Sequence, residues 1–131
     1  MLDILHYDLL DFVTSYGVRI PSLRVTYQLF GKPLGTAPVV VVNHAFTGNS
    51  QVAGENGWWA EAIGTAKVIN TDTYTVVAFN IPGNGFHARE EDIITNYQHW
   101  AAVDVARLFN IALREHLGLN SVFALVGCSL G

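Results

Sequence analysis

Residues 121–131, SVFALVGCSLG, decide the fold class that we predict for this chain of 131 residues. An apolar stretch, residues 121–127, runs directly into Gly127-Cys128-Ser129-Leu130-Gly131, which fits the pattern G-x-S-x-G. A serine in this pattern, between a strand and a helix, stands on a sharp and strained turn that closes only when its neighbours are small. We therefore predict a buried strand that ends in a nucleophile elbow, with Ser129 as the nucleophile. The alternative is a glycine-rich turn without chemistry.

The segment before this strand, residues 95–119, has the period of an amphipathic helix. Thr95 and Gln98 have the spacing of a capping box, and Gly118 suits the left-handed position at the end of a helix. We expect one face to be exposed and the opposite face to be buried: Asp104, Arg107, Asn110 and Arg114 against Val103, Ala106, Phe109, Leu113 and Leu117. A helix between two buried strands is a parallel crossover unit, which predicts an α/β fold.

Four further runs of sequence read as strands. Residues 37–44 (APVVVVNH) and 74–80 (YTVVAFN) have no polar face, as expected of strands that helices cover on both sides of a sheet. Residues 11–17 and 23–31 are β-branched and aromatic, and we expect them to form an antiparallel pair joined by a turn at residues 18–22. The prediction is a mostly parallel sheet with an antiparallel N-terminal strand pair.

Composition excludes several classes of function. The net charge is −4 and the basic residues are scattered, so no stripe exists that follows a phosphate backbone, and we expect no nucleic-acid partner. No apolar run approaches the roughly 20 residues that span a bilayer, and the first residues lack a basic region. We therefore predict a cytoplasmic protein without a membrane partner. The single cysteine, Cys128, cannot form an internal disulfide.

The loop after residues 37–44 is the second candidate for chemistry. In a fold with a nucleophile elbow, such a loop supplies one N–H of the oxyanion hole, and the residue after the nucleophile supplies the other. By position these donors are the backbone groups of Phe46 and Leu130. For His44 we favour a structural role at the end of the strand. No second histidine, cysteine or carboxylate lies near it at a metal-ligand spacing, so we predict no metal site.

A serine hydroxyl needs a histidine to accept its proton and a carboxylate to orient that histidine. After a nucleophile elbow the acid and the histidine both follow the serine in chain order. All five histidines precede Ser129, so we assign none of them as the base, and we expect packing or surface roles for His99 and His116. The expectation is that residues 1–131 form the N-terminal part of a single domain, without the part that carries the acid, the histidine and the lid.

Four segments together resemble the homoserine O-acetyltransferase family of the α/β-hydrolase superfamily: TYQLFG (26–31), NHAFTGNSQVAG (43–54), GWWAEAIGTAKVINTDTYTVVAFN (57–80) and GCSLG (127–131). The resemblance implies transfer of an acetyl group from acetyl-CoA, a co-substrate, through an acyl-enzyme to the hydroxyl of L-homoserine, on the way to methionine. Ser129 matches the family nucleophile, and Phe46 and Leu130 match its oxyanion donors. The resemblance implies no permanently bound cofactor, leaves the cofactor-binding residues unknown, and leaves a homodimer open.

Two departures from the family keep alternatives open. The chain has Gly-Cys-Ser-Leu-Gly where members usually have Gly-Gly-Ser-Met-Gly, and residues 81–85 (IPGNG) replace a Leu-Gly-Gly-Cys turn. Acetyl and succinyl donors both remain open. The second interpretation is a serine hydrolase of the same fold, with water as acceptor. The third is an inert truncated piece that associates with its other half or with another chain.

Overall fold

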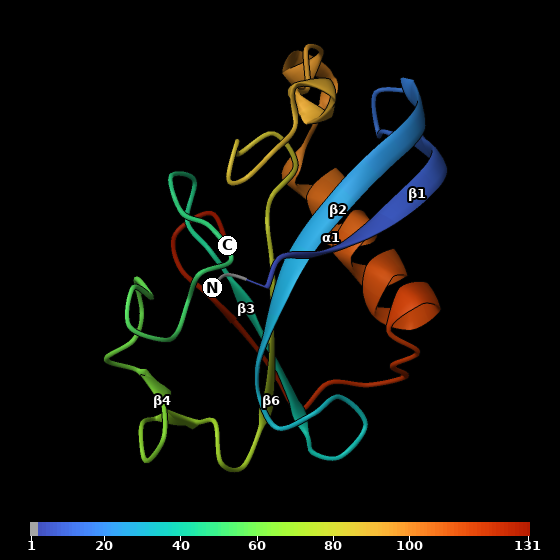
Figure 1. The fold of residues 1–131 in the computed structure, drawn as a ribbon. Coiled ribbons are helices and arrows are strands. Elements are labelled where there is room, and N and C mark those ends of the chain that lie inside the picture. The colour runs from blue at the N-terminus through green and yellow to red at the C-terminus, as the bar shows by residue number, and fades with distance from the viewer. Residues whose placement is uncertain (1–2) are drawn as a thin grey trace.

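The computed structural model describes residues 3–131 and contains a twisted sheet of five strands in the order β1-β2-β6-β3-β7 (Figure 1). Their bounds are β1 Leu5–Val13, β2 Arg19–Gly31, β3 Val39–Asn43, β6 Thr75–Phe79 and β7 Ala124–Gly127. β6, β3 and β7 run parallel, whereas β2 pairs antiparallel with β1 and with β6. The predicted α/β class, with parallel strands and an antiparallel N-terminal pair, is confirmed. Two short strands, β4 (Ile63–Gly64) and β5 (Ile69–Asn70), pair with each other.

The valines of β3 are buried on both faces of the sheet, as predicted. Val39 and Val41 belong to the cluster that includes Leu108 and Phe109 of helix α1 (Ala102–Ile111). The opposite cluster is formed by alternate residues of β3 and β6 with the segment that follows β3: Val40, Val42, Val76, Ala78, Val52, Ala53 and Ile63. The second cover is therefore an irregular segment, seen with β4 on the far side of the sheet from α1 in Figure 1. The sequence predicted helices on both faces of these strands; on this face, within the described residues, the cover is a segment without a helix, because its glycines favour turns.

The turn of the first hairpin lies earlier than residues 18–22, where the sequence placed it. The chain turns at residues 14–18 instead, where the N–H of Gly17 donates to the carbonyl of Thr14 at 2.9 Å. Gly17 has φ +81°, a value that glycine adopts without a steric cost. The antiparallel pairing is thus confirmed, and the predicted position of the turn is wrong.

Pro21, which suggested the later turn, lies inside β2. The register of β1 and β2 pairs the positions on either side of it and skips the position where Pro21 faces Asp11. Proline has no N–H to give to a ladder, so it is tolerated where the ladder is interrupted. Asp11 has φ +58° at this interruption. The proline marks an irregularity in the hairpin and not its end.

The helix begins later than the sequence suggested. Two 3₁₀ turns, Glu90–Asp92 and Tyr97–His99, precede α1, and a π-helical turn, Ala112–His116, continues it. The expected capping box of Thr95 and Gln98 is therefore wrong. The N–H of Ala101 donates to Oδ2 of Asp104 at 2.9 Å, which satisfies a free donor at the true start of the helix.

Asp104 is fully buried, although the helical period placed it on the exposed face, and Val103, expected to be buried, is 53% exposed. The Asp104 carboxylate accepts hydrogen bonds not only from Ala101 but also from the backbone N–H of Ser15 at 2.7 Å and from the Ser15 hydroxyl at 2.9 Å. Burial by itself raises the pKa of Asp104, but the hydrogen bonds from Ala101 and Ser15 outweigh it and hold the pKa below its ordinary value. The carboxylate thereby ties the hairpin turn to the start of α1.

Replacing Asp104 with alanine should lower the free energy of unfolding of the full-length protein by about 2 kcal/mol, because Ala101 and Ser15 lose their acceptor. Urea denaturation measures this change through the midpoint. The matched control is Glu115→Ala, an exposed carboxylate at the end of the same helical segment, which should leave the midpoint unchanged. Equal midpoints for the two variants would show that the Asp104 contacts do not stabilise the fold.

Candidate active site

The chain turns sharply where β7 ends. The N–H of Gly131 donates to the carbonyl of Cys128 at 3.0 Å, and Ser129 between them has φ +55°. A serine in the left-handed region is uncommon, and its backbone is strained. The turn thus has the geometry that a nucleophile elbow requires, and it presents Ser129 as an exposed residue.

The elbow is packed against the end of β3 so closely that only glycine fits at its two ends. A Cβ on Gly131 would lie 2.5 Å from the carbonyl oxygens of both Asn43 and His44. A Cβ on Gly127 would overlap the carbonyl of Gly131. The N–H of Cys128 also donates to the carbonyl of Asn43 at 3.3 Å. The two glycines of the motif are therefore required by contact with neighbouring backbone.

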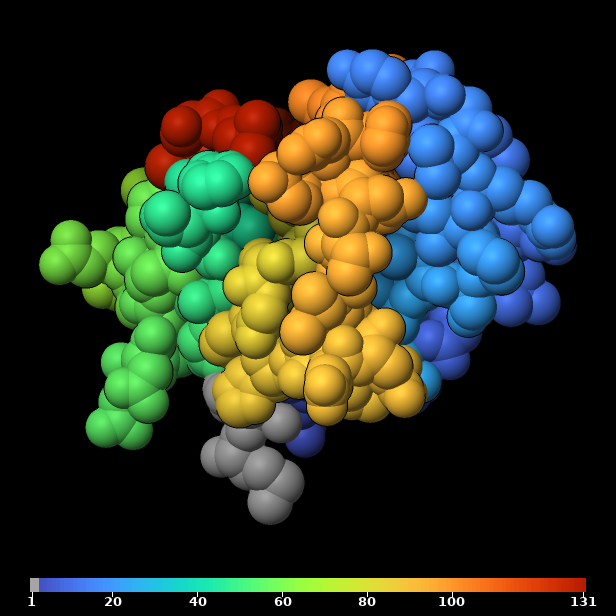
Figure 2. All heavy atoms as spheres, turned by 90° about the horizontal axis from the view of Figure 1, so that it is seen from above, coloured from blue at the N-terminus to red at the C-terminus, as the bar shows by residue number. Residues whose placement is uncertain are grey.

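The loop after β3 lies beside the elbow at the carboxyl edge of the parallel strands. Figure 2 shows the red end of the chain next to this blue-green loop, with the yellow and orange segment after β6 on the other side. The structure places Phe46 and Leu130 on the segments that directly follow β3 and β7. Their side chains are 78% and 52% exposed. Both residues predicted as oxyanion donors thus lie at the same edge of the sheet as Ser129.

Two hollows flank this edge. The larger, of about 390 Å³, is bounded by Phe46, Ile81 and Tyr97 among others. The smaller, of about 100 Å³, lies between Leu130 and the α1 residues Val105 and Phe109, and it shares Ile81 with the first. Concave surfaces with mostly apolar walls at the carboxyl ends of parallel strands are the usual place for small ligands in α/β folds.

His44 has the structural role that its position suggested. Its side chain is buried, its Nδ1–H donates to the carbonyl of Ala45 at 2.6 Å, and its Nε2 accepts the N–H of Ile81 at 2.9 Å. Because Nε2 accepts a backbone donor, the ring is neutral. Burial lowers the pKa of His44, although the hydrogen bond to Ala45 opposes this shift. The ring therefore joins the loop after β3 to the segment after β6.

The lowered pKa of His44 gives a pH dependence of stability. Below the ordinary histidine pKa of 6.5, the unfolded chain binds a proton at His44 that the folded chain does not. The contribution of neutral His44 to the free energy of unfolding is fully present above pH 6.5. It is lost as the pH falls, and the free energy of unfolding then decreases by at most about 1.4 kcal/mol per pH unit. Urea denaturation between pH 7.5 and 5.5 should show a flatter dependence for His44→Gln than for the parent. His99→Gln, at an exposed ring, is the control, and a slope unchanged by His44→Gln would contradict the assignment.

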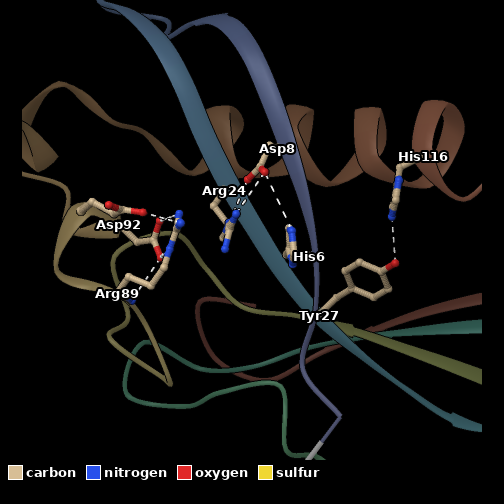
Figure 3. A network of polar contacts seen from close by, with 8 residues as sticks. His6, Asp8, Arg24, Tyr27, Arg89, Asp92 and His116 are labelled. Carbon is tan, nitrogen blue, oxygen red and sulfur yellow. Dashed lines mark hydrogen bonds and ion pairs between the residues drawn. The ribbon is translucent and has the colours of Figure 1, made fainter.

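His116 has a role of the packing or surface kind that we predicted: it is exposed and packs against neighbouring aromatic residues. Its Nε2 lies 2.9 Å from the hydroxyl of Tyr27, and its ring stacks on Tyr7 with 4.7 Å between centroids. Figure 3 shows His116 and Tyr27 pointing toward each other beside the hairpin. Within residues 3–131 no hydrogen bond or ion pair links Ser129 to a histidine or a carboxylate.

Ion pairs brace the outer side of the hairpin and the segment before α1 (Figure 3). Arg24 donates to both carboxylate oxygens of Asp8 at 2.9 and 3.1 Å, and Arg89 donates to those of Asp92 at 2.9 and 2.6 Å. The pKa values of Asp8 and Asp92 lie below their ordinary range, chiefly because of these hydrogen bonds. Such partly exposed pairs contribute little to stability. The first pair joins opposite positions of β1 and β2, and the second lies across the 3₁₀ turn at Glu90–Asp92.

A buried polar cluster consists of Asn80, Ser50 and Gln28, and it was not predicted from the sequence. The Asn80 side chain contacts both the backbone and the hydroxyl of Ser50, and that hydroxyl donates to Oε1 of Gln28 at 2.6 Å. The available signal was a single asparagine at the end of the all-apolar run of β6. A polar residue at such a place is buried only when its hydrogen bonds are satisfied.

Residues 38–131 match the family model described as the alpha/beta hydrolase fold. The match covers most of the chain and agrees with the strand order and the elbow, so this chain belongs to the α/β-hydrolase fold family. In the described part of the chain, no helix has the length and apolar character needed to cross a membrane.

Within that family the chain is similar to homoserine O-acetyltransferases, which confirms the resemblance read from the sequence. The Corynebacterium diphtheriae homoserine O-acetyltransferase is 29% identical, over 96% of this chain and 35% of its own length. The structure of homoserine O-acetyltransferase from Staphylococcus aureus is 30% identical with a TM-score of 0.78, over 100% of this chain and 39% of that one. Esterase E22 is 26% identical with a TM-score of 0.81, over 100% of this chain and 42% of that one. The chain thus spans 35–42% of the length of these three relatives.

Proposed function

We propose that this chain carries the nucleophile and the oxyanion donors of an acyltransferase that moves an acetyl group from acetyl-CoA to the hydroxyl of L-homoserine. The observation that carries the proposal is Ser129 at φ +55° on a turn closed against the end of β3. The similarity to homoserine O-acetyltransferases over 88–96% of the chain supports the choice of reaction. Acyl transfer through a serine needs acetyl-CoA only as co-substrate, so we expect no permanently bound cofactor.

In the proposed reaction Oγ of Ser129 attacks the thioester carbonyl carbon while a base takes its proton. The new C–O bond forms, the C–S bond breaks, and CoA leaves as a thiol after it receives that proton. The hydroxyl oxygen of homoserine then attacks the acyl carbon while the base takes the hydroxyl proton. The bond between that carbon and Oγ of Ser129 breaks, the base passes the proton to Oγ, and O-acetylhomoserine leaves. In both steps the negative charge develops on the carbonyl oxygen, where the N–H groups of Phe46 and Leu130 would stabilise it.

We also propose that a further segment, in the same or another polypeptide, supplies the base, its orienting carboxylate and a lid. Two observations support this proposal. The chain spans 35% of the C. diphtheriae relative, and β7 is an edge strand that exposes Leu125, with Phe123 before it, each to 65%. Large apolar side chains at a sheet edge usually pack against another element. The cytoplasmic location stays a prediction from the sequence, and the resemblance to the family leaves a homodimer open.

The direct test supplies the full-length protein with acetyl-CoA and L-homoserine and measures thiol release together with O-acetylhomoserine by mass spectrometry. We expect acetyl transfer that depends on homoserine, with the parallel double-reciprocal plots of a ping-pong mechanism. A parallel assay with succinyl-CoA in place of acetyl-CoA shows which of the two thioesters is the acyl donor. Thiol release that is independent of homoserine and of other hydroxyl acceptors would contradict the transferase function.

A serine hydrolase is the second candidate. The likeness to esterase E22 and the IPGNG segment, residues 81–85, in place of the family's usual turn favour it. This candidate predicts rapid hydrolysis of p-nitrophenyl acetate without acceleration by homoserine.

The third interpretation is an inert piece, which predicts neither acyl transfer nor ester hydrolysis. An intact mass equal to that of these 131 residues, with no companion fragment, would support it.

A further inference from the structure

The loop from His44 to Ser50 is fixed at both of its ends, and it has further contacts in between. The indole N–H of Trp58 donates to the carbonyl of Asn49 at 2.8 Å, and Nδ2 of Asn84 lies 3.4 Å from the carbonyl oxygen of Gly48. His44 is held by the N–H of Ile81, and the N–H of Ser50 donates to Oδ1 of Asn80 at 2.8 Å. Between these anchors the N–H of Gly48 donates to the carbonyl of Ala45 at 2.8 Å and closes a tight turn. The direction of the backbone within the turn is therefore set by its two anchors together with the contacts at Gly48 and Asn49.

Phe46 lies in this turn, and its side chain is 78% exposed. A side chain that is mostly exposed makes few contacts that hold its own backbone in place. The orientation of the N–H proposed as an oxyanion donor thus depends on the contacts of the loop around it, with the two anchors among them. An oxyanion donor contributes to the rate only when it points at the position where the charge develops.

The side chain of Asn80 is buried, and its amide makes every hydrogen bond that it can make. Besides the N–H of Ser50, Oδ1 accepts Nδ2 of Asn84 at 3.0 Å. The Nδ2 group donates to the Ser50 hydroxyl and to Oγ1 of Thr26, each at 2.9 Å. An amide has two donors and two acceptor sites, and all four are used here. Asn80 thus joins the loop after β3 to β2 and to the segment after β6.

We propose that Asn80 is a positioning residue that orients the backbone N–H of Phe46 toward the reacting carbonyl. The inference rests on the proposed function, because it assigns Asn80 a part in stabilising the oxyanion formed at Ser129. Asn84 strengthens the arrangement, since its Nδ2 lies 3.0 Å from Oδ1 of Asn80 and 3.4 Å from Nε2 of His44, and so it connects the two anchors.

The test is Asn80→Asp in the full-length protein, with p-nitrophenyl acetate as acyl donor so that no particular acceptor is required. The carboxylate keeps the shape of the amide but loses both N–H donors, and Thr26 and the Ser50 hydroxyl then face an acceptor. We expect kcat at pH 8 to fall by about 10- to 100-fold, with KM changed less than about twofold, because the loss acts on the transition state. The ratio of variant to parent kcat should rise as the pH is lowered, since a protonated carboxyl restores one donor.

The matched control is Asp104→Asn, the reverse exchange in a buried cluster that contacts the hairpin turn and α1. It should lower the unfolding midpoint and leave kcat unchanged. If Asn80→Asp does not fold, Ser50→Ala replaces it: this variant removes the hydroxyl partner of Nδ2 but keeps the backbone bond, and we expect kcat to fall by about 3- to 10-fold.

Two results would overturn the inference: an unchanged kcat in the Asn80 or Ser50 variant, or a loss of kcat matched by Asp104→Asn. The Ser129→Ala variant distinguishes failure of the positioning role of Asn80 from failure of the proposed function. Full activity in Ser129→Ala refutes the proposed function. Loss of activity in Ser129→Ala with full activity in Asn80→Asp refutes only the positioning role.

Discussion

Replacement of Ser129 with alanine should lower acyl transfer by the full-length protein at least about 10⁴-fold, because the reaction loses the atom that carries the acyl group. Stability should not change. Serine and alanine share the Cβ that makes φ +55° costly, so the strain at the elbow is equal in both, and Ser129 is exposed. The variant therefore isolates the chemical role of the hydroxyl from the geometry of the turn.

Two measurements check this prediction. Steady-state rates give the loss, and intact mass after rapid quenching with acetyl-CoA should show a protein heavier by one acetyl group in the parent and not in the variant. Ser121→Ala, at an exposed serine ahead of β7, is the control and should retain both signals. If Ser129→Ala kept its rate and still gained the acetyl mass, another residue would be the nucleophile.

Replacement of Gly127 with alanine should lower the free energy of unfolding by about 3 kcal/mol, because the new methyl group overlaps the carbonyl of Gly131. Backbone cannot move aside as a flexible side chain can, so the elbow has to open. A displacement of about 1 Å at a reacting group costs on the order of 100-fold in rate. We therefore expect this single methyl group to reduce both stability and acyl transfer.

Gly64→Ala is the matched control for this change. A Cβ at Gly64 would lie 3.2 Å from Cγ of Lys67, which belongs to a flexible side chain, so a small rearrangement accommodates it. Urea denaturation and the rate of p-nitrophenol release should separate the two variants clearly. A Gly127→Ala protein as stable and active as Gly64→Ala would mean that the turn does not close against Gly131.

Several features were predictable because they depend on residues close together in the sequence. The unbroken apolar runs of β3 and β6 indicated buried strands, and the G-x-S-x-G pattern indicated a strained turn after β7. Predictions that extended these local patterns further were wrong, among them the turn at residues 18–22, the helix start at Thr95 and the exposure of Asp104. Gly17, with its positive φ, sets the hairpin turn, and the contacts of Asp104 with Ser15 from far along the chain outweigh the helical period.

The sequence by itself thus determined the α/β class, the position of Ser129 and the segments that carry the proposed donors. Only the tertiary structure decided which polar groups are buried and what they contact. Ser15 is 89 positions from Asp104, Ser50 is 30 from Asn80, and His44 is 37 from Ile81. No periodicity encodes such pairs. A buried polar group is stable only where the fold brings it a partner, so its role is known only after the strands and loops have been placed.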